Sequence, residues 1–179
     1  MQTKTILRVL SILAILALAW GLRAQAVQKL PIDYDEDDYM RAGQEFAHLI
    51  RTSDWSGFLE TNYRPEHPPL VKIVMGLSFL TAPEEKLVGD RPTTSEPNKY
   101  LPRPLVKAGR TTNAIFGWLT VLLVAIINPL AGLALATHTF TIKYVSQIML
   151  EALPALTSFS MVLAYLKFKR SRKTGWLVT

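Results

Sequence analysis

The apolar residues of this chain are gathered into long blocks, and this grouping constrains the fold more than any other feature of the sequence. The blocks cover residues 6–22, 111–127, 130–145 and 153–166. A soluble domain intersperses its apolar residues with polar ones, whereas blocks of about 20 residues are typical of helices that cross a bilayer. The sequence therefore predicts an all-α membrane protein with about four transmembrane helices.

The basic residues predict the orientation of these helices. Lys4 and Arg8 lie at the start of the first block, and a basic cluster follows the last block, at Lys167, Lys169, Arg170, Arg172 and Lys173. Basic clusters beside apolar spans mark the cytoplasmic side, so an even number of spans is expected between them. We expect a multi-pass protein of the cell membrane, with residues 1–23 as a signal-anchor helix, 24–110 as an extracytoplasmic loop, 111–166 as three transmembrane helices and 167–179 as a cytoplasmic tail.

Two alternatives to this topology are compatible with the sequence. The basic start, the first apolar block and Ala24-Gln25-Ala26 also fit a cleaved secretory signal. Residues 115–135 also fit one span with a kink at the Asn128-Pro129 step, which would leave three spans and a basic tail outside the cell. The charge rule favours four spans, because they return the tail to the cytoplasm.

The net charge of +6 does not indicate a nucleic-acid partner. Basic and acidic residues nearly balance between residues 23 and 110, and the excess positive charge flanks the apolar blocks. No basic face with interleaved aromatic residues is present in the sequence, so nucleic-acid binding is not expected. The chain has no cysteine, which excludes disulfides, thiolate metal ligands and cysteine nucleophiles.

The long polar loop is expected to carry amphipathic or interfacial helices. Pro68 and Pro69 are typical of a helix start and precede a short apolar stripe. Residues 82–104, with five prolines, are expected to form an irregular surface loop. A longer stripe at helical spacing follows Asp35, at Tyr39, Ala42, Gly43, Phe46, Ala47 and Ile50.

Two acidic motifs in this loop are suited to chemistry. The adjacent carboxylates of Asp35 and Glu36 fit a general base or a metal ligand, although capping of the following helix by Asp33 or Asp35 is the simpler explanation of these acids alone. Glu66 and His67 precede two prolines that stiffen the backbone, and together they fit a divalent ion or a phosphate-bearing substrate. A histidine that merely fills a turn is the alternative.

Cations and one late acid complete the set of candidates. Lys72 and Arg110 suit a phosphate group, with a snorkelling side chain as the alternative for Lys72. Glu151 heads the last apolar block, where an ionisable residue is costly and is often functional. An interfacial pairing of Glu151 with Lys143 is the alternative.

The order of these motifs resembles the N-terminal part of the integral-membrane glycosyltransferases with the C-type fold, such as the protein O-mannosyltransferases and the aminoarabinose-lipid A transferases. Those enzymes begin with a span, followed by Asp-Glu, an amphipathic helix with Tyr, an acidic-X-Pro-Pro-Leu motif, an Arg before the second span and a later acid. The matching residues here are Asp35-Glu36, Tyr39, Asp54-Trp55, Glu66-His67-Pro68-Pro69-Leu70, Lys72, Arg110 and Glu151.

The resemblance implies transfer of a sugar from a polyprenyl-phosphate carrier to a protein or lipid acceptor on the outer face of the membrane. It implies a catalytic role for Asp35, Glu36 and Glu151, and substrate binding by Tyr39, His67, Lys72 and Arg110. Glu66 is implied as the ligand of a divalent metal ion. Membrane lipids are the remaining expected partners.

The resemblance covers nearly the whole chain but only about the first third of such an enzyme. The final residues 174–179 look like the start of a further apolar segment, so we expect the chain to be an N-terminal portion that does not catalyse transfer by itself. The alternative is a small non-enzymatic membrane protein that serves assembly or interaction.

Overall fold

The computed structural model describes residues 2–61, 63–88 and 101–177, and these residues form helices and connecting turns with no strand. The prediction of an all-α protein is confirmed. The expected irregular loop at 82–104 falls mostly on residues 89–100, which lie outside the described part. The helices are α1 (Gln2–Lys29), α2 (Glu36–Thr52), α3 (Trp55–Glu60), α4 (Pro69–Phe79), α5 (Arg103–Ile127), α6 (Pro129–Thr137), α7 (Thr139–Val145) and α8 (Ala152–Ser171), followed by a 3₁₀ turn (Thr174–Leu177).

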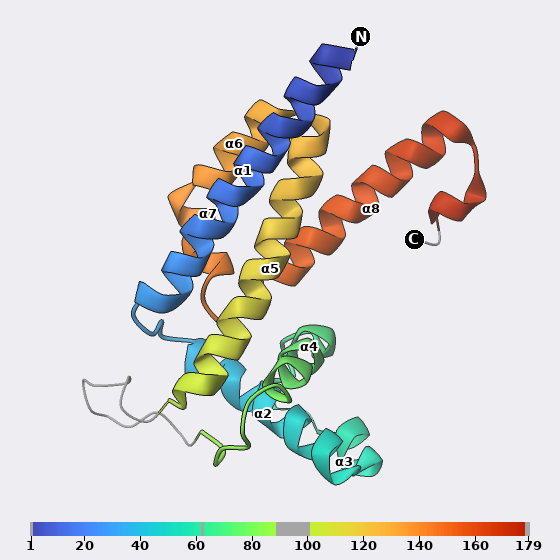
Figure 1. Ribbon diagram of the computed structural model, residues 1–179. Helices are drawn as coiled ribbons and strands as arrows, with labels where there is room; N and C mark the ends of the chain where they lie inside the picture. The colour runs from blue at the N-terminus through green and yellow to red at the C-terminus, as the bar shows by residue number, and fades with distance from the viewer. Residues whose placement is uncertain (1, 62, 89–100, 178–179) are drawn as a thin grey trace.

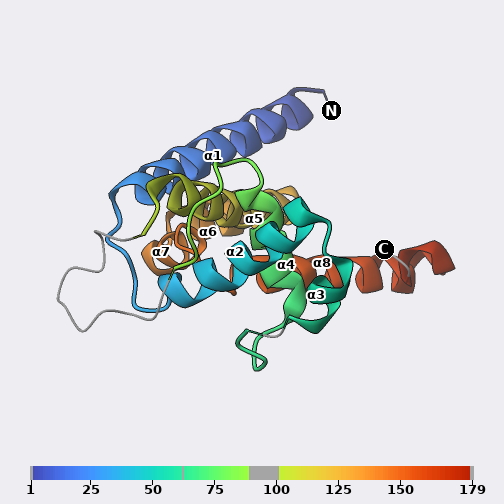
Figure 2. The ribbon, with the colours of Figure 1, turned by 90° about the horizontal axis from the view of Figure 1, so that it is seen from below.

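Five of the helices form an elongated bundle, and the other three lie across one end of it. Figure 1 shows α1 descending, α5 rising beside it, α6 and α7 descending again, and α8 rising away from the middle of α5. Helices α2, α3 and α4 lie below the bundle, and we call them the cap (Figures 1 and 2). The end of the bundle that the cap covers is called the cap end below.

Two helices in the described part of the chain are long and apolar enough to cross a membrane. They are residues Thr3–Lys29 of α1 and Arg103–Ile127 of α5. Both extend further than the apolar blocks alone predicted, so the segment between them is shorter than the expected 24–110. The extra turns consist largely of residues with good helix propensity, such as Ala24 and Gln25 at the end of α1 and Lys107 and Ala108 in α5.

The chain reverses direction at Asn128, so residues 115–135 are not one kinked helix. Asn128 is extended, and its side chain accepts hydrogen bonds from the amides of Leu130 (2.9 Å) and Ala131 (3.3 Å), which begins α6. Helix α6 then returns against α5, and Gly132 permits the contact, because a Cβ there would lie 2.5 Å from that of Ala125. The expected block at 130–145 is divided into α6 and α7 at His138, whose side chain caps α7.

The bundle has its own apolar core. It is formed by residues of α1, α5 and α6: Ile15, Leu16, Ala19, Val121, Ala125 and Ala136. Trp118 on α5 donates a hydrogen bond to the carbonyl of Leu16 (3.0 Å), and Arg23 on α1 donates one to the carbonyl of Ala136 in the last turn of α6 (3.3 Å). Helix α1 is therefore packed into the bundle through residues 15–23.

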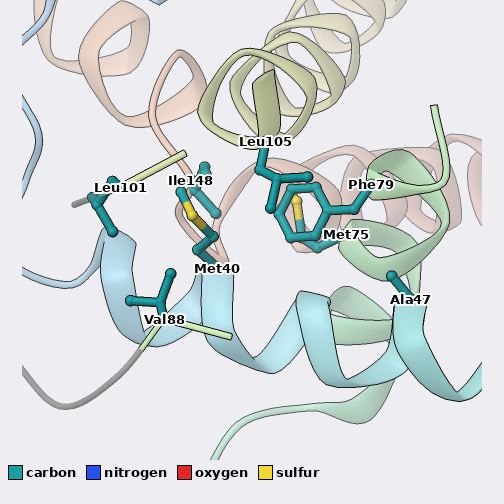
Figure 3. Packing of buried hydrophobic residues seen from close by; sticks show 8 residues of the cluster. All are labelled: Met40, Ala47, Met75, Phe79, Val88, Leu101, Leu105 and Ile148. Carbon is teal, nitrogen blue, oxygen red and sulfur yellow. The ribbon is translucent and has the colours of Figure 1, made fainter. Parts of the chain in front are cut away.

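The cap packs against α5 through a second core, drawn in Figure 3. Its buried residues come from α2, α4, α5 and two connecting segments: Met40, Ala47, Met75, Phe79, Val88, Leu101, Leu105 and Ile148. Helices α2 and α4 approach closely because Gly43 and Gly76 face each other, and a Cβ on Gly76 would lie 3.0 Å from the carbonyl oxygen of Gly43. This core fixes the first turn of α2 beneath the bundle.

Candidate functional site

Most of the acids singled out in the sequence lie at the cap end of the bundle. The first turn of α2 carries Asp35, Glu36 and Tyr39, and the turn before α4 carries Glu66 and His67. Glu151 stands at the start of α8. The negative charges of Asp35 and Glu151 both raise the pKa of the Tyr39 hydroxyl, so these three groups lie near one another.

The centre of this end is a buried ion pair between Glu36 and Arg110. The Glu36 side chain is 0% exposed and that of Arg110 is 2% exposed, and their closest atoms lie 2.6 Å apart. The Glu36 carboxylate also accepts hydrogen bonds from the amides of Ile148 (2.7 Å) and Asp33 (2.8 Å). Glu36 thus links α2 to α5, to the α1–α2 connection and to the α7–α8 connection. Each of its carboxylate oxygens accepts two hydrogen bonds from the protein.

Arg110 is equally occupied. Its Nε and one Nη donate to Glu36, and the remaining donors reach the carbonyls of Val27 (3.2 Å), Leu30 (2.8 Å) and Pro31 (2.9 Å). A guanidinium has five N–H donors, and each has a partner here. Glu36 was expected to be catalytic and Arg110 to bind the donor phosphate; both roles stay predictions, and the structure shows both side chains buried and bonded to the protein.

Lys72 holds the turn that presents His67. Its ammonium group is buried and donates to the carbonyls of Tyr63 (2.9 Å) and Arg64 (3.1 Å). Burial lowers the pKa of Lys72 below its ordinary value. The expected contact of Lys72 with a substrate phosphate stays a prediction, and in this structure the ammonium group contacts the backbone.

Asp38 fastens the same turn from the side of α2. Its carboxylate pairs with Arg64 and accepts a hydrogen bond from the Tyr63 hydroxyl (2.9 Å). Arg64 has a positive φ of 57°, a conformation that non-glycine residues adopt only when their surroundings hold them there. Asp38 was not among the expected site residues.

Tyr39 lies among the groups best placed for chemistry. Its ring meets the His67 ring edge to face, with the centroids 5.2 Å apart. Burial, followed by the negative charges of Asp35, Glu151 and Asp38, raises the pKa of the Tyr39 hydroxyl. A neutral phenol next to carboxylates is suited to donate a hydrogen bond to a substrate oxygen.

Asp35, like Glu151, makes no side-chain hydrogen bond or ion pair within the described residues. It occupies the N-cap position of α2, but its side chain makes no capping hydrogen bond. The start of the helix is held by Asp33 and Glu36, since the amide of Asp33 donates to the Glu36 carboxylate and the amide of Glu36 to the Asp33 carbonyl (3.3 Å). Asp35 is half-buried, so its carboxylate faces both the protein and the solvent.

Glu151 is exposed and does not form the expected alternative pair with Lys143. The Lys143 ammonium lies 2.9 Å from the Asp33 carboxylate instead. This pair ties α7 to the segment that precedes α2. Burial alone would raise the pKa of Asp33, but hydrogen bonds from Lys143 and from the Tyr34 amide outweigh it and lower that pKa.

Glu66 lies beside two basic groups. Its carboxylate is 3.5 Å from Arg64 and 3.7 Å from the His67 ring. Glu66 and His67 are adjacent potential ligands, but no group of three His, Cys, Asp or Glu side chains comes together within the described ranges. The role of Glu66 as a metal ligand therefore stays a prediction.

The acids around Tyr39 lead to a prediction about the pKa of its hydroxyl group. Asp35→Asn and Glu151→Gln should each lower the pKa of the Tyr39 hydroxyl, because each removes a negative charge that opposes formation of the phenolate. The titration can be followed by NMR of isotope-labelled tyrosine, with Tyr39→Phe used to assign the signal. Asp54→Asn, which removes the cap of α3, is the matched control and should leave the titration unchanged. An unchanged Tyr39 titration in both test variants would contradict the cluster.

Comparison of the chain with protein-family models, with curated proteins and with solved structures gives no match.

Proposed function

We propose that the chain is the N-terminal part of a membrane glycosyltransferase that moves a sugar from a polyprenyl-phosphate carrier to a protein or lipid hydroxyl. The observation that carries the proposal is the cluster of Asp35, Tyr39, His67 and Glu151 at one end of a helical bundle with two membrane-length helices. The resemblance of the motif order to the C-type-fold glycosyltransferases supports the same conclusion.

In this proposal Asp35 is the general base. Its unpartnered carboxylate accepts the proton of the acceptor hydroxyl while that oxygen forms a bond to the anomeric carbon of the sugar. The bond from the anomeric carbon to the phosphate oxygen breaks, and polyprenyl phosphate leaves with the electron pair. Tyr39 and His67 are placed to orient the sugar or the acceptor, and Glu151 adds a second acid at the opening.

The buried Glu36–Arg110 pair supports this arrangement by holding the base. Glu36 is the residue next to Asp35, so its bonds to α5 fix the backbone that carries the catalytic carboxylate. Rigid support within about 0.5 Å is what catalytic groups require. Lys72 and Asp38 hold His67 in the same way.

We further propose that the bundle crosses the cell membrane four times, with the cap on the outer face. Helices α1, α5, α6–α7 and α8 alternate in direction (Figure 1), and α1 and α5 have the length and composition of spans. The basic residues at the end of α8 then lie at the cytoplasmic side. The packing of α1 into the bundle core supports a retained anchor over a cleaved signal.

The topology leads to a labelling prediction. Because the chain has no cysteine, a single Ser56→Cys on α3 provides a unique thiol in the cap, and Ser171→Cys provides one at the other end of α8. In intact cells an impermeant thiol reagent should label Ser56→Cys, whereas Ser171→Cys should react only after the membrane is opened. The reverse pattern, or equal labelling of both in intact cells, would overturn the proposed orientation.

One observation favours a different function, a non-enzymatic role in membrane assembly. The cap exposes a group of large apolar side chains, Trp55 (60% exposed), Leu59 (84%) and Leu70 (58%). Such a surface suits contact with a partner protein or with the membrane. In this case Trp55→Ala and Leu59→Ala would abolish function, while substitutions at Asp35 would not.

The enzymatic proposal is tested by sugar transfer. Membranes that contain the natural protein should move labelled sugar from a polyprenyl-phosphate sugar to endogenous acceptors, and membranes of cells lacking the gene should not. Equal transfer by the two preparations would contradict the proposal.

A further inference from the structure

The cations at the cap end fall into two groups, those engaged by the protein and those without a partner. Arg110 and Lys72 are engaged by carboxylate and carbonyl oxygens, as described above. Arg51 donates to the carbonyls of Phe79 and Ala82, and Arg64 and Lys143 are paired with carboxylates. Each of these groups already makes an internal contact, so an anionic ligand would compete with an oxygen atom of the protein for it.

Lys86 lines a pocket together with the acids Glu84 and Glu85, whereas three other unengaged cations of the described part gather in one place. Lys29, Arg103 and Lys107 are exposed, and none of them makes a hydrogen bond or ion pair with its side chain in the described part of the chain. All three line one cleft of about 570 Å³ between the last turn of α1 and the first turns of α5. Arg103 and Lys107 are four residues apart and therefore share a face of α5.

The cleft contains no negative charge among its described lining residues. The carbonyls of Val27, Leu30 and Pro31, which form one side of it, are already occupied by Arg110. The first turn of α5 has no acidic residue either. Three cations of like sign held together in this way repel one another, and an anion between them relieves that repulsion.

The rest of the lining is apolar, which indicates the kind of anion. Val27, Ile32, Leu101 and Val106 lie beside the three cations. The cleft is also at the ends of α1 and α5, the two helices of membrane length, where the phosphate of a lipid lies next to its hydrocarbon chain. A free anion uses only the cations, whereas a lipid phosphate uses both parts of the lining.

We propose that this cleft binds the phosphate group of a membrane lipid at the outer surface. The inference rests on the membrane placement in the proposed function, and it deepens that function by providing cations for a polyprenyl-phosphate carrier where Lys72 and Arg110 are occupied. Lys29, Arg103 and Lys107 contact the phosphate, and the apolar residues contact the first carbons of the chain. Asp35, which in the proposed function acts on the acceptor hydroxyl, is not among the residues that line the cleft.

The test measures binding of lipid phosphates to the purified full chain at a fixed concentration of non-ionic detergent. Farnesyl phosphate, phosphatidylglycerol and inorganic phosphate are titrated against wild type and against the triple variant Lys29→Gln, Arg103→Gln, Lys107→Gln. Each basic residue near an anionic lipid contributes about a factor of five to affinity, so the triple variant should bind farnesyl phosphate about 100-fold more weakly. The substituted side chains are exposed, and circular dichroism should show an unchanged fold.

The matched control removes the same charge at the other end of the molecule. Lys4→Gln, Arg172→Gln, Lys173→Gln should change farnesyl phosphate affinity by less than about threefold, because these exposed residues do not line the cleft. Equal weakening by both triple variants, or no binding of either lipid to wild type, would overturn the inference. Inorganic phosphate that binds as tightly as the lipids would also overturn it, because the apolar lining would then contribute nothing.

Further measurements distinguish failure of the proposed lipid site from failure of the proposed enzymatic function. Wild type that binds both lipids supports a general lipid-phosphate site, and preference for farnesyl phosphate supports a carrier site. In the transfer assay the triple variant should raise the KM for the polyprenyl-phosphate sugar and retain kcat. Asp35→Asn should leave lipid binding unchanged. If Asp35→Asn abolishes transfer but the wild-type protein binds no lipid, the proposed lipid site in the cleft is rejected and the proposed enzymatic function remains.

Discussion

Arg110→Ala should lower the free energy of unfolding by about 3–5 kcal/mol, because it leaves the Glu36 carboxylate buried without its counter-charge. The substitution also removes the donors to the carbonyls of Val27, Leu30 and Pro31, which follow or end α1. The loss can be measured as a fall in the midpoint of thermal or denaturant unfolding in detergent, followed by circular dichroism.

One control for this prediction changes another arginine of α5, and the other replaces both Glu36 and Arg110. Arg103→Ala removes an exposed arginine seven residues earlier on α5 and should change stability by less than about 0.5 kcal/mol. The double variant Glu36→Leu, Arg110→Met should be more stable than Arg110→Ala, since no unpaired buried charge remains. Equal stability of Arg110→Ala and Arg103→Ala would show that the pair does not hold the cap to the bundle.

The helical architecture was predictable because it depends on local patterns. The apolar blocks mark the bundle helices, and the stripe after Asp35 marks α2. The Asn128-Pro129 step also has a local signal, since Asn is a good N-cap and Pro is tolerated in the first turn of a helix. The division at His138 was not predicted, because nothing in an apolar block indicates that a histidine side chain will cap a new helix.

The roles of adjacent acids could not be predicted, and Asp35 and Glu36 show why. Successive residues on a helix point about 100° apart, so neighbours in the sequence enter different surroundings. Glu36 points into the bundle toward Arg110, and Asp35 stays half-buried without a bond. A sequence pattern that treats Asp-Glu as one motif cannot separate the buried, paired acid from the half-buried one.

Whether a basic side chain is already bonded to the protein is a second property that depends on the tertiary fold. Lys72 and Arg110 have the residue type that a lipid phosphate needs, but backbone carbonyls brought near by folding occupy them. Lys29 and Lys107, by contrast, drew no attention in the sequence because no motif contains them. They lie together only because the end of α1 and the start of α5 are adjacent.

Asp35→Asn should reduce sugar transfer by about 10²–10⁴-fold in membranes that contain the natural protein, because the amide cannot accept the proton of the acceptor hydroxyl. The substitution keeps the size of the side chain, and Asp35 makes no capping hydrogen bond that its loss would break. Protein level and thermal stability should therefore match wild type, which separates a chemical defect from a folding defect. The measurement is the initial rate of label transfer from a polyprenyl-phosphate sugar at saturating donor.

Two matched variants decide whether this loss is specific to Asp35. Asp54→Asn removes a carboxylate that caps α3 through the amide of Gly57 (2.9 Å), and it should retain transfer within about threefold. Glu36→Gln should lower stability together with activity, because its carboxylate is bonded to Arg110. Asp35→Asn that retains transfer at the level of Asp54→Asn would reject the assignment of Asp35 as the base.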